Sequence, residues 1–182
     1  KKMIKVWHIE ITDADRVPAA LKNGERPYEL KQVTHPLPEL SRFLYLAVGA
    51  KWFWYMRLTW TYQQWVELLA RPSLVTWVAY IDGTPIGYFE LETQPDGNVE
   101  IGYFGLISEF IGQGYGRSLL EDAIRTAWEL GGKRIWLHTC TLDHPQALPN
   151  YLARGFEIFK EEEFEDNIPD ENLQPWPGAR KY

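Results

Sequence analysis

The sequence predicts an α+β fold, in which a mixed and mainly antiparallel sheet carries helices on both faces. One observation is a set of short alternating or largely apolar segments, typical of strands, of which residues 99–107 are an example. A second is the dipeptide Asp82-Gly83 between two such segments, which is typical of a hairpin turn. A third is an amphipathic segment that begins at Arg117 and ends at the glycines 131–132. Together they describe strands joined by tight turns and covered by helices.

The N-terminal part is predicted to supply two strands and two helices. Residues 4–11 alternate well enough for a first strand, and residues 28–33 form a short strand within a segment rich in prolines. Pro38 is suited to the first turn of a helix, which we expect to continue to about residue 48. Thr61 is a candidate cap for a second helix over residues 62–70.

The C-terminal part supplies the remaining elements. Strands are expected at residues 76–81, 86–92, 99–107, 134–140 and 156–163. The helix from Arg117 places apolar side chains on one face, namely Leu119, Leu120, Ala123, Ile124, Ala127 and Trp128. No internal repeat interrupts this order, so the 182 residues are expected to form a single domain. Residues 161–182 combine an acidic run with prolines and are expected to be an extended, partly mobile tail.

A glycine-rich turn joins the strand at 99–107 to the helix from Arg117. Gly112, Gly114 and Gly116 alternate along it, and glycine allows positive φ or close approach of a ligand to the backbone. The helix start that follows presents unpaired N–H groups and the positive end of a dipole. The spacing excludes a P-loop and the Rossmann pattern G-x-G-x-x-G. The turn therefore predicts a phosphate or pyrophosphate site.

Two motifs identify a family. Residues 111–116 resemble the acetyl-CoA pyrophosphate loop [QR]-x-x-G-x-[GA] of the GNAT superfamily of N-acetyltransferases, with Ile111 in place of the usual Gln or Arg. Residues 147–156 match the pattern A-x-x-x-Y-x-x-x-G-F of the same family, although Pro149 is unusual there. The resemblance covers about residues 76–160, and the first 70 residues carry no recognised motif.

The resemblance implies a GNAT-like fold in which the strands at 99–107 and 134–140 splay apart and CoA lies in the wedge. Backbone groups of the first strand would pair with the pantetheine arm, the glycine turn would hold the pyrophosphate, and His144 occupies the place of an asparagine that contacts the cofactor. The expected acetyl-CoA contacts are Phe104, Leu106, Ile107, Gly112, Gln113, Gly114, Tyr115, Gly116, Arg117, His144 and Ala147.

Two residues are candidates for the chemistry of acetyl transfer. Tyr151 matches the tyrosine that in this family often protonates the departing CoA thiolate; the alternative is a core aromatic packed beside Phe156. Glu100 begins a mostly apolar strand, where burial would raise its pKa and make it a base for the incoming amine. Glu100 as a solvated residue after a turn remains open. A backbone N–H near Leu106 would stabilise the oxyanion.

Two further acidic residues share a face of the preceding strand. Antiparallel pairing about the turn at 95–98 predicts Glu90 near Tyr103 and Glu92 near Ile101, on the face opposite Glu100. Their expected role is an exposed or substrate-side acidic patch, or a second base.

Aromatic residues cluster between positions 52 and 65. Trp54, Leu58, Tyr62 and Trp65 approximate a helical stripe that would face the core. In the family this region usually covers the acceptor site, so the aromatics would also suit a pocket for an apolar or cationic amine. Both interpretations stay open.

The amino-acid composition limits the classes of partner and the compartment that we expect for this protein. A net charge of −6 argues against a general nucleic-acid binder and favours cationic acceptors, either a small-molecule amine or a protein amine. No stretch approaches the length of a membrane span. The single cysteine, Cys140, excludes an internal disulfide and fits a reducing, cytoplasmic compartment. No spacing resembles a metal site, and a homodimer is left open. A CoA-binding sensor without turnover is the alternative to an enzyme.

Overall fold

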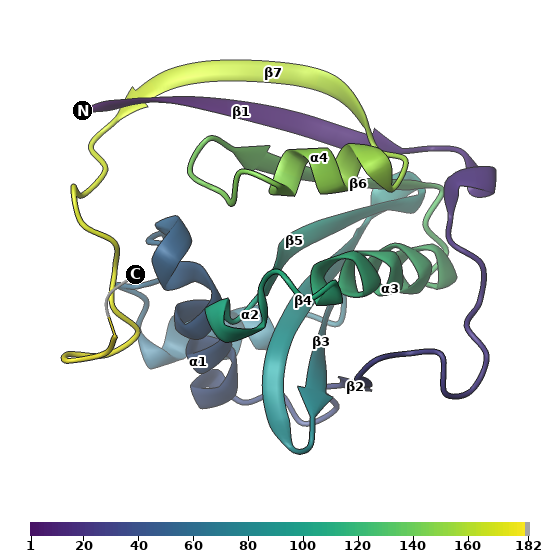
Figure 1. Cartoon of the computed structure of the whole chain (residues 1–182), viewed down its shortest axis with the longest axis horizontal. Coiled ribbons are helices and arrows are strands. Elements are labelled where there is room, and N and C mark those ends of the chain that lie inside the picture. Colours follow the sequence, from purple (N-terminus) through teal and green to yellow (C-terminus); the bar gives the residue numbers. More distant parts are fainter. Residues whose placement is uncertain (181–182) are drawn as a thin grey trace.

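The computed structural model describes residues 1–180 and contains one seven-stranded sheet (Figure 1). Its strands are β1 (Lys2–Ile11), β2 (Glu29–Gln32), β3 (Leu74–Ile81), β4 (Thr84–Gln94), β5 (Asn98–Leu106), β6 (Arg134–Cys140) and β7 (Glu157–Asp166). The α-helices of this range are α1 (Pro38–Gly49), α2 (Tyr62–Leu69), α3 (Tyr115–Glu129) and α4 (Ala147–Ala153). The strand order is β2-β3-β4-β5-β6-β1-β7, and every neighbouring pair is antiparallel except β5–β6.

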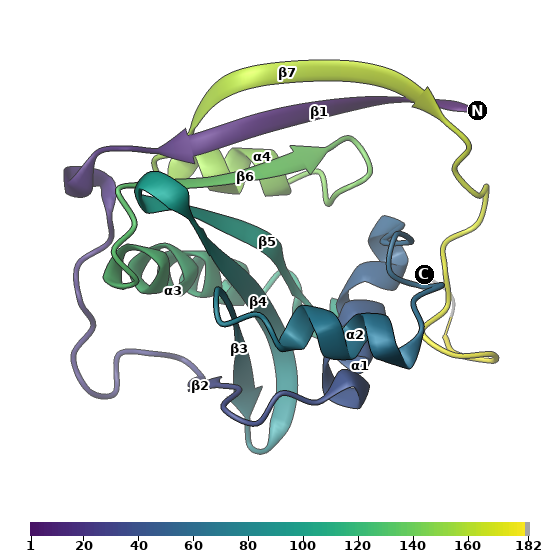
Figure 2. The same ribbon diagram turned by 180° about the vertical axis from the view of Figure 1, so that it is seen from behind.

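Helices cover both faces of the sheet, as the views from front and back show (Figures 1 and 2). On one face, Leu120 and Ile124 of α3 belong to a buried cluster with Phe89 and Leu91 of β4. On the other face, α1 contributes to a second buried cluster that includes Tyr88 of β4. Successive residues of a strand point to opposite faces, so Tyr88 and Phe89 pack into clusters on opposite faces of the sheet. The predicted fold class is confirmed.

Local sequence signals explain where the helices begin. Thr61 and Gln64 form a capping box at the start of α2, with the Thr61 hydroxyl 3.3 Å from the Gln64 backbone nitrogen. Pro38 opens α1 as predicted. The helix expected from Arg117 starts two residues earlier, at Tyr115, because Gly114 takes positive φ and ends the preceding turn. Its expected apolar face and its end near Gly131 agree with the structure.

The strands β5 and β6 pair over only a short distance. Their parallel register joins Asn98–Glu100 to residues 134–136, and no pairing continues beyond Glu100 in residues 1–180. The expected splaying of these two strands is therefore confirmed. A register shift between Glu90 and Leu91 of β4 adds a bulge on β5 near the point of separation.

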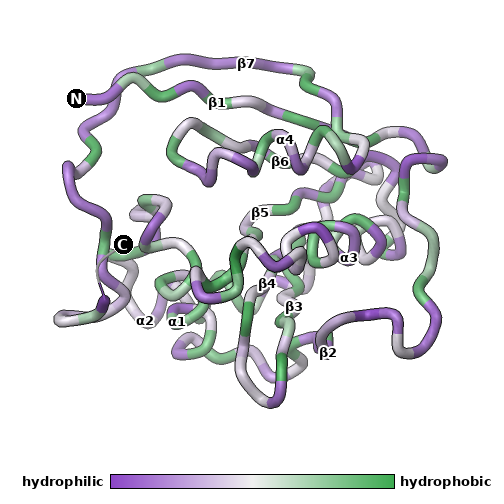
Figure 3. Tube along the Cα trace, viewed as in Figure 1, coloured by the Kyte–Doolittle hydropathy of each residue, from purple (hydrophilic) through white to green (hydrophobic). Residues whose placement is uncertain are grey.

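Two local predictions were wrong. Residues 53–60 form turns rather than helix, so Tyr62 is 61% exposed while Trp65 is 2% exposed, and no single stripe faces the core. The segment expected to be a tail from residue 161 begins as strand, since β7 continues to Asp166 and pairs with β1. Figure 3 shows β7 as hydrophilic along most of its length, which explains why it resembled a tail. Charged side chains on an exposed edge strand protect it from pairing with other chains.

Candidate functional site

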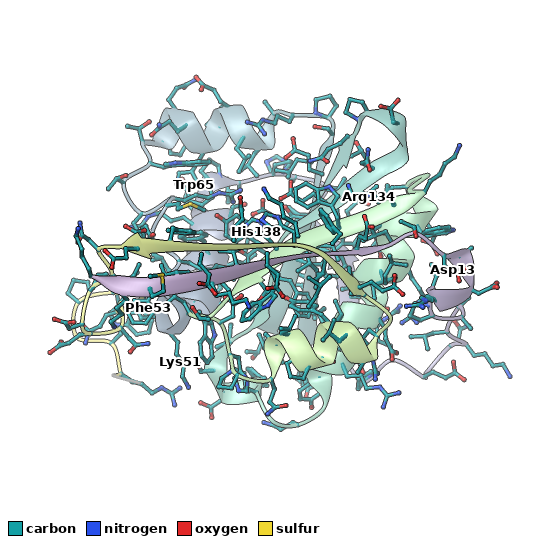
Figure 4. All side chains as sticks on the ribbon, turned by 90° about the horizontal axis from the view of Figure 1, so that it is seen from above. Asp13, Lys51, Phe53, Trp65, Arg134 and His138 are labelled. Atoms are coloured by element: carbon teal, nitrogen blue, oxygen red, sulfur yellow. The ribbon has the colours of Figure 1, made fainter. Side chains whose placement is uncertain are left out.

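An open cleft of about 970 Å³ lies where β5 and β6 separate. Its loop half is formed by the end of β5, the glycine turn and α4, and includes Phe104, Leu106, Ile111, Gly112, Gly114, Gly116, Arg117, His144, Ala147 and Tyr151. Its aromatic half is formed by residues 52–57, the middle of β4 and β5, and the β1–β7 pair, and includes Ile4, Val6, Tyr45, Trp52, Phe53, Trp54, Tyr55, Met56, Arg57, Glu90, Glu92, Glu100, Tyr103 and Phe164. In Figure 4, Phe53 lies at one end of the β1–β7 pair and Arg134 toward the other, with His138 between them.

The glycine turn of the loop half leaves room for a ligand. Gly112 and Gly114 both have φ of +86°, and a Cβ built on either would meet no atom within 4 Å. Gly114 is the N-cap of the 15-residue helix α3, and no side chain of the described residues caps that end. The first-turn N–H groups therefore have no capping side chain, and the turn beside them has open space, an arrangement that suits a phosphate group.

The end of β5 offers backbone groups to the cleft. The Ile107 N–H donates to the Ile86 carbonyl of β4, with a nitrogen–oxygen distance of 2.8 Å. Because peptide groups alternate in direction along an antiparallel strand, those of Phe104 and Leu106 point away from β4, toward the gap left by β6. These two residues can pair with an extended ligand, whereas the Ile107 amide is already used.

Three expected cofactor contacts do not line the cleft. Ile107 pairs with β4 as described. The Gln113 side-chain amide donates to the Glu109 carbonyl at 3.0 Å, and so stiffens the turn. The Tyr115 ring packs against the rings of Tyr28 and Phe110, at centroid distances of 6.5 and 6.4 Å. Only the backbone N–H groups of Gln113 and Tyr115 remain as candidates for contact with a ligand.

Tyr151 lies between the loop half and the hydrophobic core. Its side chain is 8% exposed, and its ring packs edge-on against Phe104 and Phe156 at centroid distances of 6.1 and 5.9 Å. Burial, and to a smaller extent the carboxylate of Asp143, raise the pKa of the Tyr151 phenol well above its usual value. The phenol therefore keeps its proton at neutral pH and is available as a hydrogen-bond donor to negative charge that develops in the cleft.

Glu100 lies opposite Glu92 across the β4–β5 pair. The prediction that Glu92 lies near Ile101, on the face opposite Glu100, was wrong, because the bulge on β5 shifts the register by one residue. Burial, followed by the charge of Glu92, raises the pKa of Glu100, while a hydrogen bond from the Gln94 amide at 3.1 Å opposes that shift. The predicted pairing of Glu90 with Tyr103 is confirmed.

Glu90 forms a buried ion pair, so the expectation of an exposed carboxylate was wrong, although Glu90 does line the aromatic half of the cleft. Its carboxylate accepts two hydrogen bonds from the Arg57 guanidinium, at 2.7 and 3.2 Å, and its residue is 3% exposed. The Arg57 guanidinium lies 4.3 Å from the Tyr103 ring centroid and 5.0 Å from that of Trp60. Nothing in the sequence pointed to Arg57, because its partner is 33 residues away.

The segment that follows β6 connects the two halves. The Gln146 N–H donates to Nδ1 of His144 at 3.0 Å, and the His144 ring packs edge-on against Trp52 at 5.3 Å. Asp143 accepts hydrogen bonds from the Thr139 hydroxyl and from the Cys140 N–H. Burial raises the pKa of the Cys140 thiol to about 11, so its thiolate is scarce at neutral pH.

Other classes of site find little support in residues 1–180. No group of three or more His, Cys, Asp or Glu side chains there could hold a metal ion. None of the helices in the same range is long and apolar enough to cross a membrane. The cleft with its two halves is therefore the candidate functional site.

Comparison with known families shows which family the chain belongs to. The model of the acetyltransferase (GNAT) family matches residues 35–156, which is more than half of the chain. The protein belongs to this family. The match begins at residue 35, so it includes α1 and residues 52–65, which lie outside the part of the chain that carries the two motifs.

Solved structures agree on the fold. An acetyltransferase of the GNAT family from Novosphingobium aromaticivorans has a TM-score of 0.60 at 16% identity, over 89% of this chain and 63% of that chain. A GCN5-related N-acetyltransferase from Sphaerobacter thermophilus has a TM-score of 0.65 at 17% identity, over 88% of this chain and 50% of that chain. This chain thus spans less than two thirds of the length of either.

A third structure, an aminoglycoside acetyltransferase from an uncultured soil metagenomic sample, has a TM-score of 0.58 at 15% identity. The match covers 72% of this chain and 89% of that chain. No curated protein sequence matches the chain. At these levels of identity the three structures establish the fold and leave the acceptor open.

Proposed function

We propose that this protein is an acetyl-CoA-dependent N-acetyltransferase that moves the acetyl group directly to an amine. One observation carries the proposal: an uncapped helix start with two unobstructed glycines opens into the same cleft as a buried phenol and a desolvated carboxyl group. The first feature suits a diphosphate, and the other two suit proton transfer at a thioester. Membership of the family supports acetyl-CoA as the donor.

The loop half binds the donor in this proposal. Backbone N–H groups of residues 112–117 hold the diphosphate, and the exposed Arg117 side chain adds positive charge. The peptide groups of Phe104 and Leu106 pair with the pantetheine arm and so place the thioester near Tyr151. The Leu106 N–H is the candidate donor to the oxyanion that forms on the carbonyl.

The aromatic half receives the amine. Glu100, directly or through water, takes a proton from the ammonium form, and the free amine attacks the thioester carbon to form the C–N bond. The C–S bond then breaks as Tyr151 gives its proton to the departing sulfur, and the new amide nitrogen loses its second proton, which restores the Tyr151 phenol through solvent. Glu100 releases to solvent the proton that it took. The products are the N-acetylated amine, free CoA and one proton. The raised pKa of Glu100 brings this carboxylate closer to the basicity that proton removal requires.

Direct transfer is preferred to an acetylated enzyme. Cys140 is the only cysteine of the chain, and burial keeps it in the thiol form. With acetyl-CoA alone, intact-protein mass spectrometry should therefore show no acetyl adduct. An adduct that forms and disappears on addition of an amine would replace direct transfer by a two-step mechanism.

The activity is tested by thiol release from acetyl-CoA in the presence of a panel of amines, with the product identified by mass. Amine-dependent thiol release that matches the acetylated product is the expected result. Binding of CoA with no release for any amine would instead establish a sensor, the alternative raised by the departures at Ile111, His144 and Pro149.

A further inference from the structure

We infer that the acceptor is a small monoamine whose amino group is attached to an aromatic or other apolar body. This inference rests on the proposed function, because it assigns the aromatic half of the cleft to the acceptor. Four features carry it: the number of carboxylates that lack a cationic partner, the composition of the walls, the cations placed on those walls, and the contacts that hold one wall in place.

The carboxylates of the aromatic half leave one charge for the substrate. Glu90 is neutralised by Arg57 in the buried pair. Glu92 is paired with Arg71 at 3.1 Å. Among the described residues that line the cleft, Glu100 and Asp143 form no ion pair. Asp143 accepts hydrogen bonds from Thr139 and Cys140, whereas Glu100 lies in the aromatic half and accepts one from the Gln94 amide. One carboxylate suits one ammonium group, whereas a polycation brings several charges that would stay unpaired against apolar walls.

The walls of the aromatic half are largely apolar. The segment before Arg57 contributes five consecutive large side chains, namely Trp52, Phe53, Trp54, Tyr55 and Met56. The β1–β7 pair contributes Ile4, Val6 and Phe164. Such walls gain free energy from an apolar ligand and cannot replace the hydration of a hydroxyl-rich sugar.

Cations lie on the same walls. The Lys2 ammonium is 5.4 Å from the Phe53 ring centroid, and the Lys51 ammonium is 5.1 Å from that of Trp52. The aromatic faces that could hold an ammonium group of the substrate are thus approached by side chains of the protein itself. The Arg57 guanidinium likewise lies over the rings of Tyr103 and Trp60. These ring faces are therefore less available to a second ammonium group of a substrate.

The C-terminal segment holds this wall in place. The Tyr55 hydroxyl donates to the Asp166 carboxylate at 2.5 Å. The Asn172 side-chain amide donates to the Lys51 carbonyl, and Ile168 between them is 6% exposed. A wall fixed at both of its ends loses little conformational freedom on binding, which favours a small ligand of defined shape.

The first test compares three acceptors with the full chain: 2-phenylethylamine, spermidine and sisomicin. We expect kcat/KM for 2-phenylethylamine to exceed that for either polycation by roughly tenfold or more. Binding of each amine in the presence of CoA is measured separately by tryptophan fluorescence, since Trp52 and Trp54 line the cleft.

A matched pair of variants locates the acceptor. Phe164 lines the aromatic half and is 46% exposed, whereas Phe43 of α1 lies outside the cleft and is 45% exposed. Phe164→Ala should raise KM for 2-phenylethylamine roughly fivefold and leave the affinity for CoA unchanged. Phe43→Ala should change neither. Equal effects of the two variants would overturn the assignment.

The outcomes separate the two proposals. Preferential acetylation of spermidine or sisomicin would overturn the inferred acceptor class and leave the proposed function standing. Binding of 2-phenylethylamine without acetyl transfer would overturn the proposed function and leave the binding site standing. Failure of all three amines to bind or react, with CoA bound normally, would overturn the inferred acceptor class.

Discussion

The two halves of the cleft are built in different ways. The loop half uses backbone groups of neighbouring residues, chiefly 104–117, whose conformation follows from a strand, a glycine turn and a helix start. The aromatic half uses side chains brought together from distant positions, such as Arg57 with Glu90 and Tyr55 with Asp166. A site made from backbone depends on main-chain conformation, and a site made from side chains depends on pair contacts. Substitutions should therefore damage the two halves by different routes.

The largest effect is expected from breaking the buried pair of the aromatic half. Arg57→Met leaves the Glu90 carboxylate buried without its cation, which should lower the free energy of unfolding by about 3–5 kcal/mol. Chemical denaturation measures this change. The double variant Arg57→Met/Glu90→Gln should recover much of the loss, because it removes the unpaired charge.

Arg71 provides the control for that pair. Its side chain is 54% exposed and pairs with Glu92 at the surface. Arg71→Met should therefore cost no more than about 1 kcal/mol. If Arg71→Met lowered the free energy of unfolding as much as Arg57→Met, burial of the Arg57–Glu90 pair would not explain its contribution to stability.

Backbone conformation is tested next, in the loop half. Gly114→Val places a branched side chain at a φ of +86° and fills space meant for the diphosphate. Calorimetry should show the dissociation constant for CoA rising roughly 100-fold. Gly131 has a φ of +84° with open space around it, at the other end of α3. Gly131→Val should suffer similar strain and bind CoA as the wild type does.

A smaller effect is expected from the buried phenol of the loop half. Tyr151→Phe removes the proton donor and keeps the ring that packs on Phe104 and Phe156. The maximal rate should fall roughly 10-fold to 100-fold, with the affinity for acetyl-CoA unchanged. Tyr62→Phe on the exposed surface of α2 is the control. An unchanged rate in Tyr151→Phe would remove the residue from the mechanism.

The smallest effect is a shift in pH dependence. The charge of Glu92 raises the pKa of Glu100, so its removal in Glu92→Gln should lower that pKa. The acidic limb of kcat/KM would then move to lower pH, by less than about one unit. In Glu100→Gln the same limb should disappear. A limb that persists in Glu100→Gln would exclude this carboxyl group as the base.

What could be predicted from the sequence differs between the loop half and the aromatic half in the same way. The glycine turn, the apolar face of α3 and the hairpin at Asp82-Gly83 depend on short-range spacing, and the structure agrees with each, although α3 starts two residues before Arg117. The register around Glu92 and Glu100 was missed, because a bulge leaves no mark in an alternating pattern. Arg57 was missed because only the folded chain brings it to Glu90.

The central claim is that backbone amides at the start of α3 bind the diphosphate of CoA. Titration calorimetry of the folded wild-type chain with CoA and with pantetheine, which lacks the diphosphate, tests it most directly. The account predicts heat of binding with CoA and an affinity for pantetheine weaker by roughly tenfold or more. No heat with CoA at millimolar concentration, or equal affinity for the two ligands, would contradict it.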